Sequence, residues 1–170
     1  MTQSPSRRAA ALRILGGVAL LAGGALWPWQ AAQAQFRVEI AGVGATQIPI
    51  AIGTFRDEAR VPQPVSRIIK SDLERSGLFR ILDASADRLD DSSRPPLPDW
   101  RGKGADALLA GSATPLVDGR FDVRYQLWDV LKGQGSGIVS MVVPAADLRQ
   151  AAHRIADDIY QRLTGDMGVF

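Results

Sequence analysis

Between residues 48 and 82 an apolar stretch, an amphipathic stretch and a second apolar stretch follow one another, and this order strongly limits the possible folds. Residues 48–55 are nearly all apolar and rich in isoleucine, which predicts a strand buried on both faces, with Pro49 at its start. Residues 65–73 repeat apolar side chains at helical spacing, and Gly77 ends the predicted helix. With residues 78–82 as the next strand, the order predicts a βαβ unit with parallel strands.

The second half of the chain predicts further strands and one long helix. Residues 105–114 begin as an interior strand, and Asp118 and Gly119 predict a tight hairpin turn in which both residues take left-handed backbone. The returning strand alternates apolar and polar side chains, and a looser turn leads to a last strand at 138–143. Apolar residues then recur at helical spacing from 148 to 163, before a tail that is predicted to run off the helix end.

These elements predict an α/β fold, in which a mixed five- to six-stranded sheet is packed by two main helices in a single domain. Residues 83–104 are rich in Asp, Ser and Pro, which predicts a long polar connection that is the segment most prone to vary or move. Trp100 and Trp128 are expected to pack beneath this connection, and exposed anchors for a partner are the alternative.

The first 34 residues have the features of an export signal. Three arginines, at positions 7, 8 and 13, precede an apolar run at 14–27, which is shorter than the roughly 20 residues of a membrane span. Ala32 and Ala34 then form the small-x-small pattern that signal peptidase accepts. We therefore expect cleavage after Ala34 and a soluble periplasmic product, with an uncleaved anchor as the alternative.

Composition excludes several classes of protein. The whole chain has 20 Lys and Arg against 18 Asp and Glu, and all three basic residues of the first 34 belong to the predicted signal. The remaining, nearly balanced charge does not suggest nucleic-acid binding, which needs a clustered positive surface. The absence of cysteine excludes a disulfide framework, a thiolate metal site and a cysteine nucleophile.

The sequence shows no set of residues suited to catalysis, a metal or a cofactor. His153 is the only histidine, and its place near the border of the apolar stripe predicts a surface or partly packed side chain. The acidic pairs at 57–58, 90–91 and 157–158 point apart on regular elements and are predicted to be solvated. The glycines at 42–44 and 133–137 lead into strands, so neither cluster can open a phosphate-binding helix.

The segment that follows the predicted cleavage site suggests recognition. Residues 36–40 alternate apolar and charged side chains, as a half-buried or edge strand does, and glycines at 42 and 44 join them to the next strand. Such a terminal strand can detach and pair with the sheet edge of another protein. An ordinary first strand of the chain's own sheet is the alternative.

Several segments together resemble the amino-terminal domain of the TolB family, a component of the bacterial Tol–Pal system. They are residues 36–40, 48–52, 69–79, 125–130, 153–160 and 163–170. The resemblance covers essentially all of residues 35–170, and it implies three parts: a signal peptide at 1–34, a partner-binding segment at 35–46 and an α/β domain at 47–170. The β-propeller that follows this domain in the family is absent from the chain, which indicates a truncated product or part of a longer protein.

The resemblance implies a non-enzymatic periplasmic adaptor that acts in outer-membrane integrity and in envelope invagination at cell division. In the family, the extreme amino terminus of the mature protein is recognised by TolA, an inner-membrane protein, and the propeller carries the surface for the lipoprotein Pal. No residue of this chain inherits the role in Pal binding. The residues expected to bind a TolA-like partner are Phe36, Arg37, Val38, Glu39, Ile40, Ala41, Gly42, Val43 and Gly44.

A periplasmic α/β domain that binds or hydrolyses a small ligand is the alternative function. Such a site would lie at the carboxyl ends of the parallel strands, where the polar candidates are Thr54, Asp57 and Ser112. These three residues contain no convergent acid–base set, so the sequence favours the adaptor.

Overall fold

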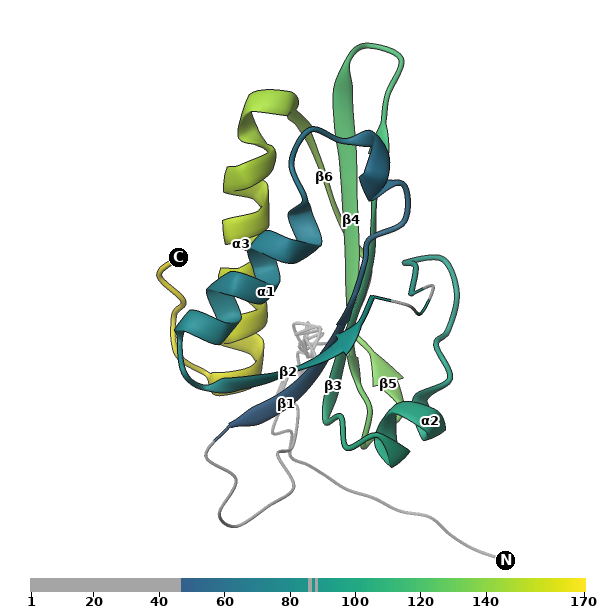
Figure 1. Cartoon of the computed structure of the whole chain (residues 1–170), viewed down its shortest axis with the longest axis vertical. Coiled ribbons are helices and arrows are strands. Elements are labelled where there is room, and N and C mark those ends of the chain that lie inside the picture. Colours follow the sequence, from purple (N-terminus) through teal and green to yellow (C-terminus); the bar gives the residue numbers. More distant parts are fainter. Residues whose placement is uncertain (1–46, 86, 88) are drawn as a thin grey trace, which may run out of the picture. The chain divides into compact units, whose positions relative to one another are not determined.

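β1 (Ile48–Gly53) lies in the middle of the sheet, and each of its residues is buried. It pairs in parallel with β2 (Phe79–Ala84) on one side and with β3 (Ala107–Pro115) on the other. The short 3-10 helix η1 (Glu58–Arg60) and α1 (Val65–Arg75) connect β1 to β2. The computed structural model describes residues 47–85, 87 and 89–170 (Figure 1), and in this range it confirms the predicted βαβ unit.

β3 turns back into β4 (Arg120–Asp129), its antiparallel neighbour. Two shorter strands share the other side of β4. β5 (Gln134–Gly135) pairs with the last residues of β4, and β6 (Val139–Pro144) pairs with its first half. The order β2-β1-β3-β4, with β5 and β6 both beside β4, makes a six-stranded mixed sheet and confirms the predicted fold class.

The turn between β3 and β4 differs from the prediction. Gly119 has a φ of 81°, whereas Asp118 has no positive φ, so the prediction of left-handed backbone at both residues is wrong. The N–H of Gly119 donates to the carbonyl of Leu116 at 3.1 Å, and the N–H of Leu116 donates to the carbonyl of Arg120 at 2.8 Å. The loop between Pro115 at the end of β3 and Arg120 at the start of β4 is longer than a two-residue hairpin turn. Such a loop needs left-handed backbone only at its glycine.

α1 and α3 (Leu148–Thr164) cover one face of the sheet (Figure 1). α3 follows the 3-10 helix η2 (Ala145–Asp147) and ends at Gly165, whose φ of 86° suits a glycine at a helix terminus. The main core lies between these helices and the sheet. Its largest fully buried side chains are Ile50, Ile52, Ile69, Leu73, Leu109, Leu127, Leu148, Ile155 and Ile159.

A second, smaller core lies on the opposite face, where the short helix α2 (Leu97–Gly102) packs (Figure 1). The alternation of a strand supplies both cores, because Ile50 and Ile52 face the long helices whereas Ala51 faces α2. Trp100 and Trp128 belong to this second core and are 2% and 9% exposed. The prediction that both tryptophans pack beneath the long connection is therefore confirmed.

The carboxyl-terminal tail folds back onto α3, so the prediction that it runs off the helix end is wrong. The ring of Phe170 meets the ring of Tyr160 edge to face at 5.7 Å, and Tyr160 contacts Phe79 of β2 at 5.9 Å. The N–H of Phe170 donates to the Asp157 carboxylate at 3.1 Å. Aromatic packing and this hydrogen bond hold a segment whose sequence lacks helical or strand periodicity.

Candidate functional site

The predicted partner-binding segment at 35–46 and the predicted cleavage site at Ala32 and Ala34 lie outside the residues that the structure describes. The described chain starts where this segment joins the domain. The N–H of Ile48 donates to the carbonyl of Leu78 at 2.7 Å, and the side-chain amide of Gln47 donates to the carbonyl of Gly77 at 3.2 Å. The segment therefore enters the domain at the amino end of the central strand, beside the start of β2.

Within the described residues, β2 pairs with β1 only, so its other edge is unpaired. Arg80 and Asp83 are exposed on this edge strand, and Ile81 and Leu82 are half-buried. Lys70 of α1 donates to Asp83 at 3.0 Å. The pKa of the Asp83 carboxyl is lowered to about 2, first because the Ser85 hydroxyl donates to it and then because Lys70 does. The edge strand β2 thus carries charged side chains at its second residue, Arg80, and at its fifth, Asp83.

The three polar residues predicted for a small-ligand site do not form an accessible cluster. Thr54 is exposed, whereas Ser112 is fully buried on β3. Asp57 has left-handed backbone with a φ of 61°, and its carboxylate accepts hydrogen bonds from Thr114 at 3.2 Å and from Arg56 at 3.3 Å. These contacts fix the end of β1 against β3, which is a structural role.

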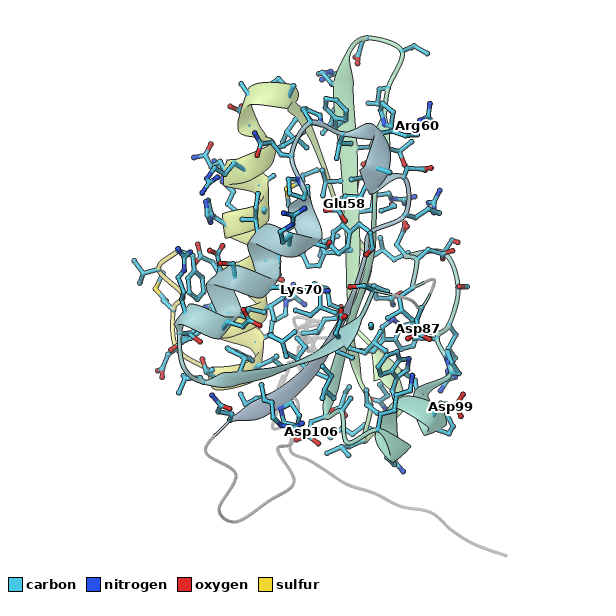
Figure 2. The ribbon with its side chains drawn as sticks, viewed as in Figure 1. Glu58, Arg60, Lys70, Asp87, Asp99 and Asp106 are labelled. Carbon is cyan, nitrogen blue, oxygen red and sulfur yellow. The ribbon has the colours of Figure 1, made fainter. Side chains whose placement is uncertain are left out.

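Glu58 is buried and caps α1, so the prediction that the 57–58 pair is solvated is wrong for Glu58. Its carboxylate accepts from the N–H of Phe55 at 3.0 Å and from the N–H and the hydroxyl of Ser66, both at 2.6 Å. Figure 2 shows Glu58 above the start of the helix. A carboxylate at this place satisfies free N–H groups and interacts favourably with the helix dipole.

Asp91 is also buried, and the prediction of a solvated 90–91 pair is wrong for this residue as well. It lies between two arginines, Arg56 after β1 at 3.3 Å and Arg124 of β4 at 3.6 Å. Asp90 instead accepts from Ser92 and Ser93 in a local turn, and the Ser92 hydroxyl is the main cause of its lowered pKa. The polar connection at 83–104 is thus anchored by the ion pairs of Asp91 with Arg56 and Arg124. Both partners are far from Asp91 in the sequence, so the residues next to Asp91 give no sign of these pairs.

Two polar pairs join the helices to the rest of the domain. His153 of α3 lies 2.6 Å from the buried carboxylate of Asp72 in α1, which confirms a partly packed histidine.

The Tyr125 hydroxyl donates to Asp158 at 2.7 Å, and the pKa of Tyr125 is raised, mainly by burial and then by this bond. Arg162 donates to the same carboxylate at 2.6 Å. Asp157 and Asp158 are half-buried and accept hydrogen bonds within the fold, so the prediction that the 157–158 pair is solvated is only partly confirmed.

Residues 47–85, 87 and 89–170 contain no group of three or more acidic or histidine side chains that could hold a metal ion. The helices described in the same range include none that is long and apolar enough to cross a membrane.

Asp106 is the one described carboxyl with a raised pKa, first because it is desolvated and then because Asp129 lies nearby, while Arg80 opposes the shift. Glu58, Asp91 and Asp72 each join separate elements of the domain through the contacts described above.

The geometry defines an α/β domain with an open mixed sheet and an amino-terminal segment that enters its central strand. The TolB amino-terminal domain family matches residues 36–136. The Tol-Pal system protein TolB of Polaromonas naphthalenivorans is 54% identical over 153 residues, which cover 90% of this chain and 35% of that protein. The protein of the same name from Bordetella pertussis is 46% identical over 160 residues, with coverages of 94% and 36%.

The crystal structure of TolB from Acinetobacter baumannii superposes with a TM-score of 0.59 at 33% identity, and covers 76% of this chain and 31% of that one. The chain therefore belongs to the TolB amino-terminal domain family of the Tol–Pal system. It spans about a third of the length of these relatives.

Proposed function

We propose that this chain acts as a non-enzymatic periplasmic adaptor of the Tol–Pal system, and that residues 35–45 are captured by a TolA-like inner-membrane protein. The observation that carries the proposal is the family match, which begins at Phe36 and so includes residues 36–45 of this segment. The cellular role in this proposal is maintenance of the outer membrane and inward movement of the envelope at division. Contact with a Pal-like lipoprotein is not proposed for this chain, which spans about a third of the length of its relatives.

The capture step in this proposal is strand addition. Residues 36–40 alternate apolar and charged side chains, which suits a strand with one face against a partner's core. Main-chain hydrogen bonds would supply affinity, and the side chains of Phe36, Val38 and Ile40 would supply specificity. The relatives that match this chain are Tol-Pal system proteins, which supports an adaptor over an enzyme.

Before capture, we propose that the segment pairs with the outer edge of β2. A strand outside β2 lies two strand spacings from β1, or about 10 Å, and residues 41–47 can span up to about 25 Å. An antiparallel alignment that sets Ile40 beside Phe79 also sets Glu39 beside Arg80. This alignment also sets Val38 beside Ile81, which continues the apolar face of the sheet at two positions, and the Glu39–Arg80 pair joins opposite charges across strands.

A partner then competes with the β2 edge for the same segment, so its apparent affinity depends on the fraction of molecules in which the segment is free. Deletion of residues 35–45 should abolish binding to the periplasmic domain of TolA and leave the circular dichroism spectrum of the α/β domain unchanged. A variant with residues 36–40 reordered so that the alternation is lost is the matched control, and it should bind as poorly as the deletion. Undiminished binding by the deletion variant would end the proposal.

Arg80→Glu tests the resting position separately. Cross-strand charge pairs contribute about 0.2–1 kcal/mol, so the loss of the Glu39–Arg80 pair should strengthen TolA binding by up to about fivefold. Arg154→Glu reverses a charge on the exposed face of α3 and is the control, with no expected change. Equal affinities of the Arg80→Glu variant and the parent would reject the β2 edge as the resting place but not the capture itself.

A further inference from the structure

The tip of the β3–β4 hairpin contains the single Asp–Gly pair of the chain, Asp118 and Gly119. In such a pair the backbone nitrogen of the glycine can attack the side-chain carboxyl carbon of the aspartate, because glycine has no Cβ to hinder the approach. The attack expels one water and forms a five-membered succinimide ring. A water then opens the ring to aspartate or to isoaspartate, in which the backbone runs through the side-chain carboxyl group.

The hairpin tip is open enough for this reaction. Asp118 and Gly119 are exposed, and the neighbouring Val117 is fully exposed. A Cβ at Gly119 would meet no atom within 4 Å, so no other part of the described chain packs closely against this side of the glycine. Asp91 also precedes a small residue, but its side chain is 1% exposed and is held by two ion pairs. Loop tips are the places where covalent change concentrates, and this tip is the accessible one.

The Arg120 side chain opposes ring closure. One carboxylate oxygen of Asp118 accepts from the N–H of Arg120 at 3.0 Å, and the other accepts from Nε of the same residue at 2.8 Å. The pKa of the Asp118 carboxyl is lowered, first by the bond from the Arg120 side chain and then by the bond from its N–H. Ring closure expels the hydroxyl group of the neutral acid as water, so a cation that favours the anion slows the reaction.

The attacking nitrogen is engaged as well. The N–H of Gly119 donates to the carbonyl of Leu116 at 3.1 Å. Ring closure therefore requires that the tip opens, with the Asp118 carboxylate released from Arg120 and the Gly119 N–H released from Leu116. The rate then follows the population of the open tip, because such local openings are fast compared with the chemistry.

We propose that Asp118 is a site of spontaneous isomerisation to isoaspartate and that Arg120 restrains it. The product has one additional backbone atom between Leu116 and Arg120. The N–H of Leu116 donates to the carbonyl of Arg120 at 2.8 Å, and this bond closes the loop at the start of β4. A longer loop loses this closing bond, so the modified chain has a frayed hairpin end.

Incubation of the purified chain at 37 °C, with methylation by an isoaspartyl methyltransferase and fragmentation of the peptide that contains residue 118, measures the rate. The chain has no asparagine, so deamidation adds nothing to the signal. Arg120→Ala removes the Nε bond and the ion pair and should isomerise about two- to fivefold faster, which is the range that an exposed ion pair contributes. Arg120→Lys keeps the charge and should lie between this variant and the parent.

Arg67→Ala removes an exposed arginine of α1 and is the control, with the rate of the parent. Asp118→Glu cannot form the five-membered ring and should give no signal. An Arg120→Ala variant without isoaspartate at 118 would overturn the site, and equal rates in Arg120→Ala and Arg67→Ala would overturn the restraint. Faster hydrogen exchange at the Leu116 amide of the aged chain is the expected sign of the frayed end. These results are independent of TolA capture, which uses residues 35–45.

Discussion

The buried carboxylate of Glu58 provides a direct test of how α1 is held. Glu58→Ala leaves the N–H groups of Phe55 and Ser66 without their acceptor, and a buried unsatisfied group costs about 1–3 kcal/mol. Water entering the vacated space recovers part of this cost. Two such groups would together cost about 2–6 kcal/mol, and because water recovers part of this cost we expect the free energy of unfolding to fall by about 3 kcal/mol.

Urea unfolding followed by circular dichroism at 222 nm measures the change. Glu58→Gln keeps the shape and one acceptor oxygen and should cost about half as much, and Ser66→Ala should cost about 1 kcal/mol because it removes only the hydroxyl bond. Glu74→Ala, on the exposed side of the same helix, is the matched control and should change stability by less than about 0.5 kcal/mol. A Glu58→Ala variant as stable as the control would refute the role of Glu58 as a cap.

Three further predictions concern packing and pH. Gly111→Ala should cost about 1–3 kcal/mol in urea unfolding, because its Cβ would lie 2.7 Å from the Arg124 carbonyl and from the Phe55 ring, whereas Gly102→Ala meets no atom within 4 Å and should be neutral or stabilising. Gly168→Ala should release the tail, since its Cβ would lie 2.6 Å from Asp157, and faster hydrogen exchange at the Phe170 amide would report this. The pKa of Asp106 is raised in the folded state, so the fold binds its proton more tightly and loses stability as pH rises through that pKa. Asp106→Asn should therefore stabilise the protein relative to the parent more at pH 7 than at pH 3, and an equal difference at both values would contradict the shift.

The sequence predicted the elements whose signal is local. The apolar run at 48–55, the stripe at 65–73 and the stripe at 148–163 each bury a face wide enough to fix the type of element, and all three are confirmed. The parallel pairing of β1 with β2 followed from their order along the chain. The two-residue strand β5 is too short to leave a periodic signal.

The buried charges were missed because their partners are distant in sequence or act through backbone groups. Asp91 is buried by Arg56, 35 residues away, and Asp72 pairs with His153, 81 residues away. A signal did exist for Asp72, which lies on the apolar stripe of α1 beside Leu73 and Ile69. A carboxylate on such a stripe predicts a buried cationic or hydrogen-bonding partner, and the one histidine of the chain was the available candidate.

Hydrogen exchange at the amides of residues 36–40, measured with and without the periplasmic domain of TolA, tests the adaptor proposal most directly. We expect intermediate protection in the chain alone, well below that of the β1 amides, and strong protection once the partner is added. Protection equal to that of β1 in both samples would show a permanent strand of the chain's own sheet and contradict capture by a partner.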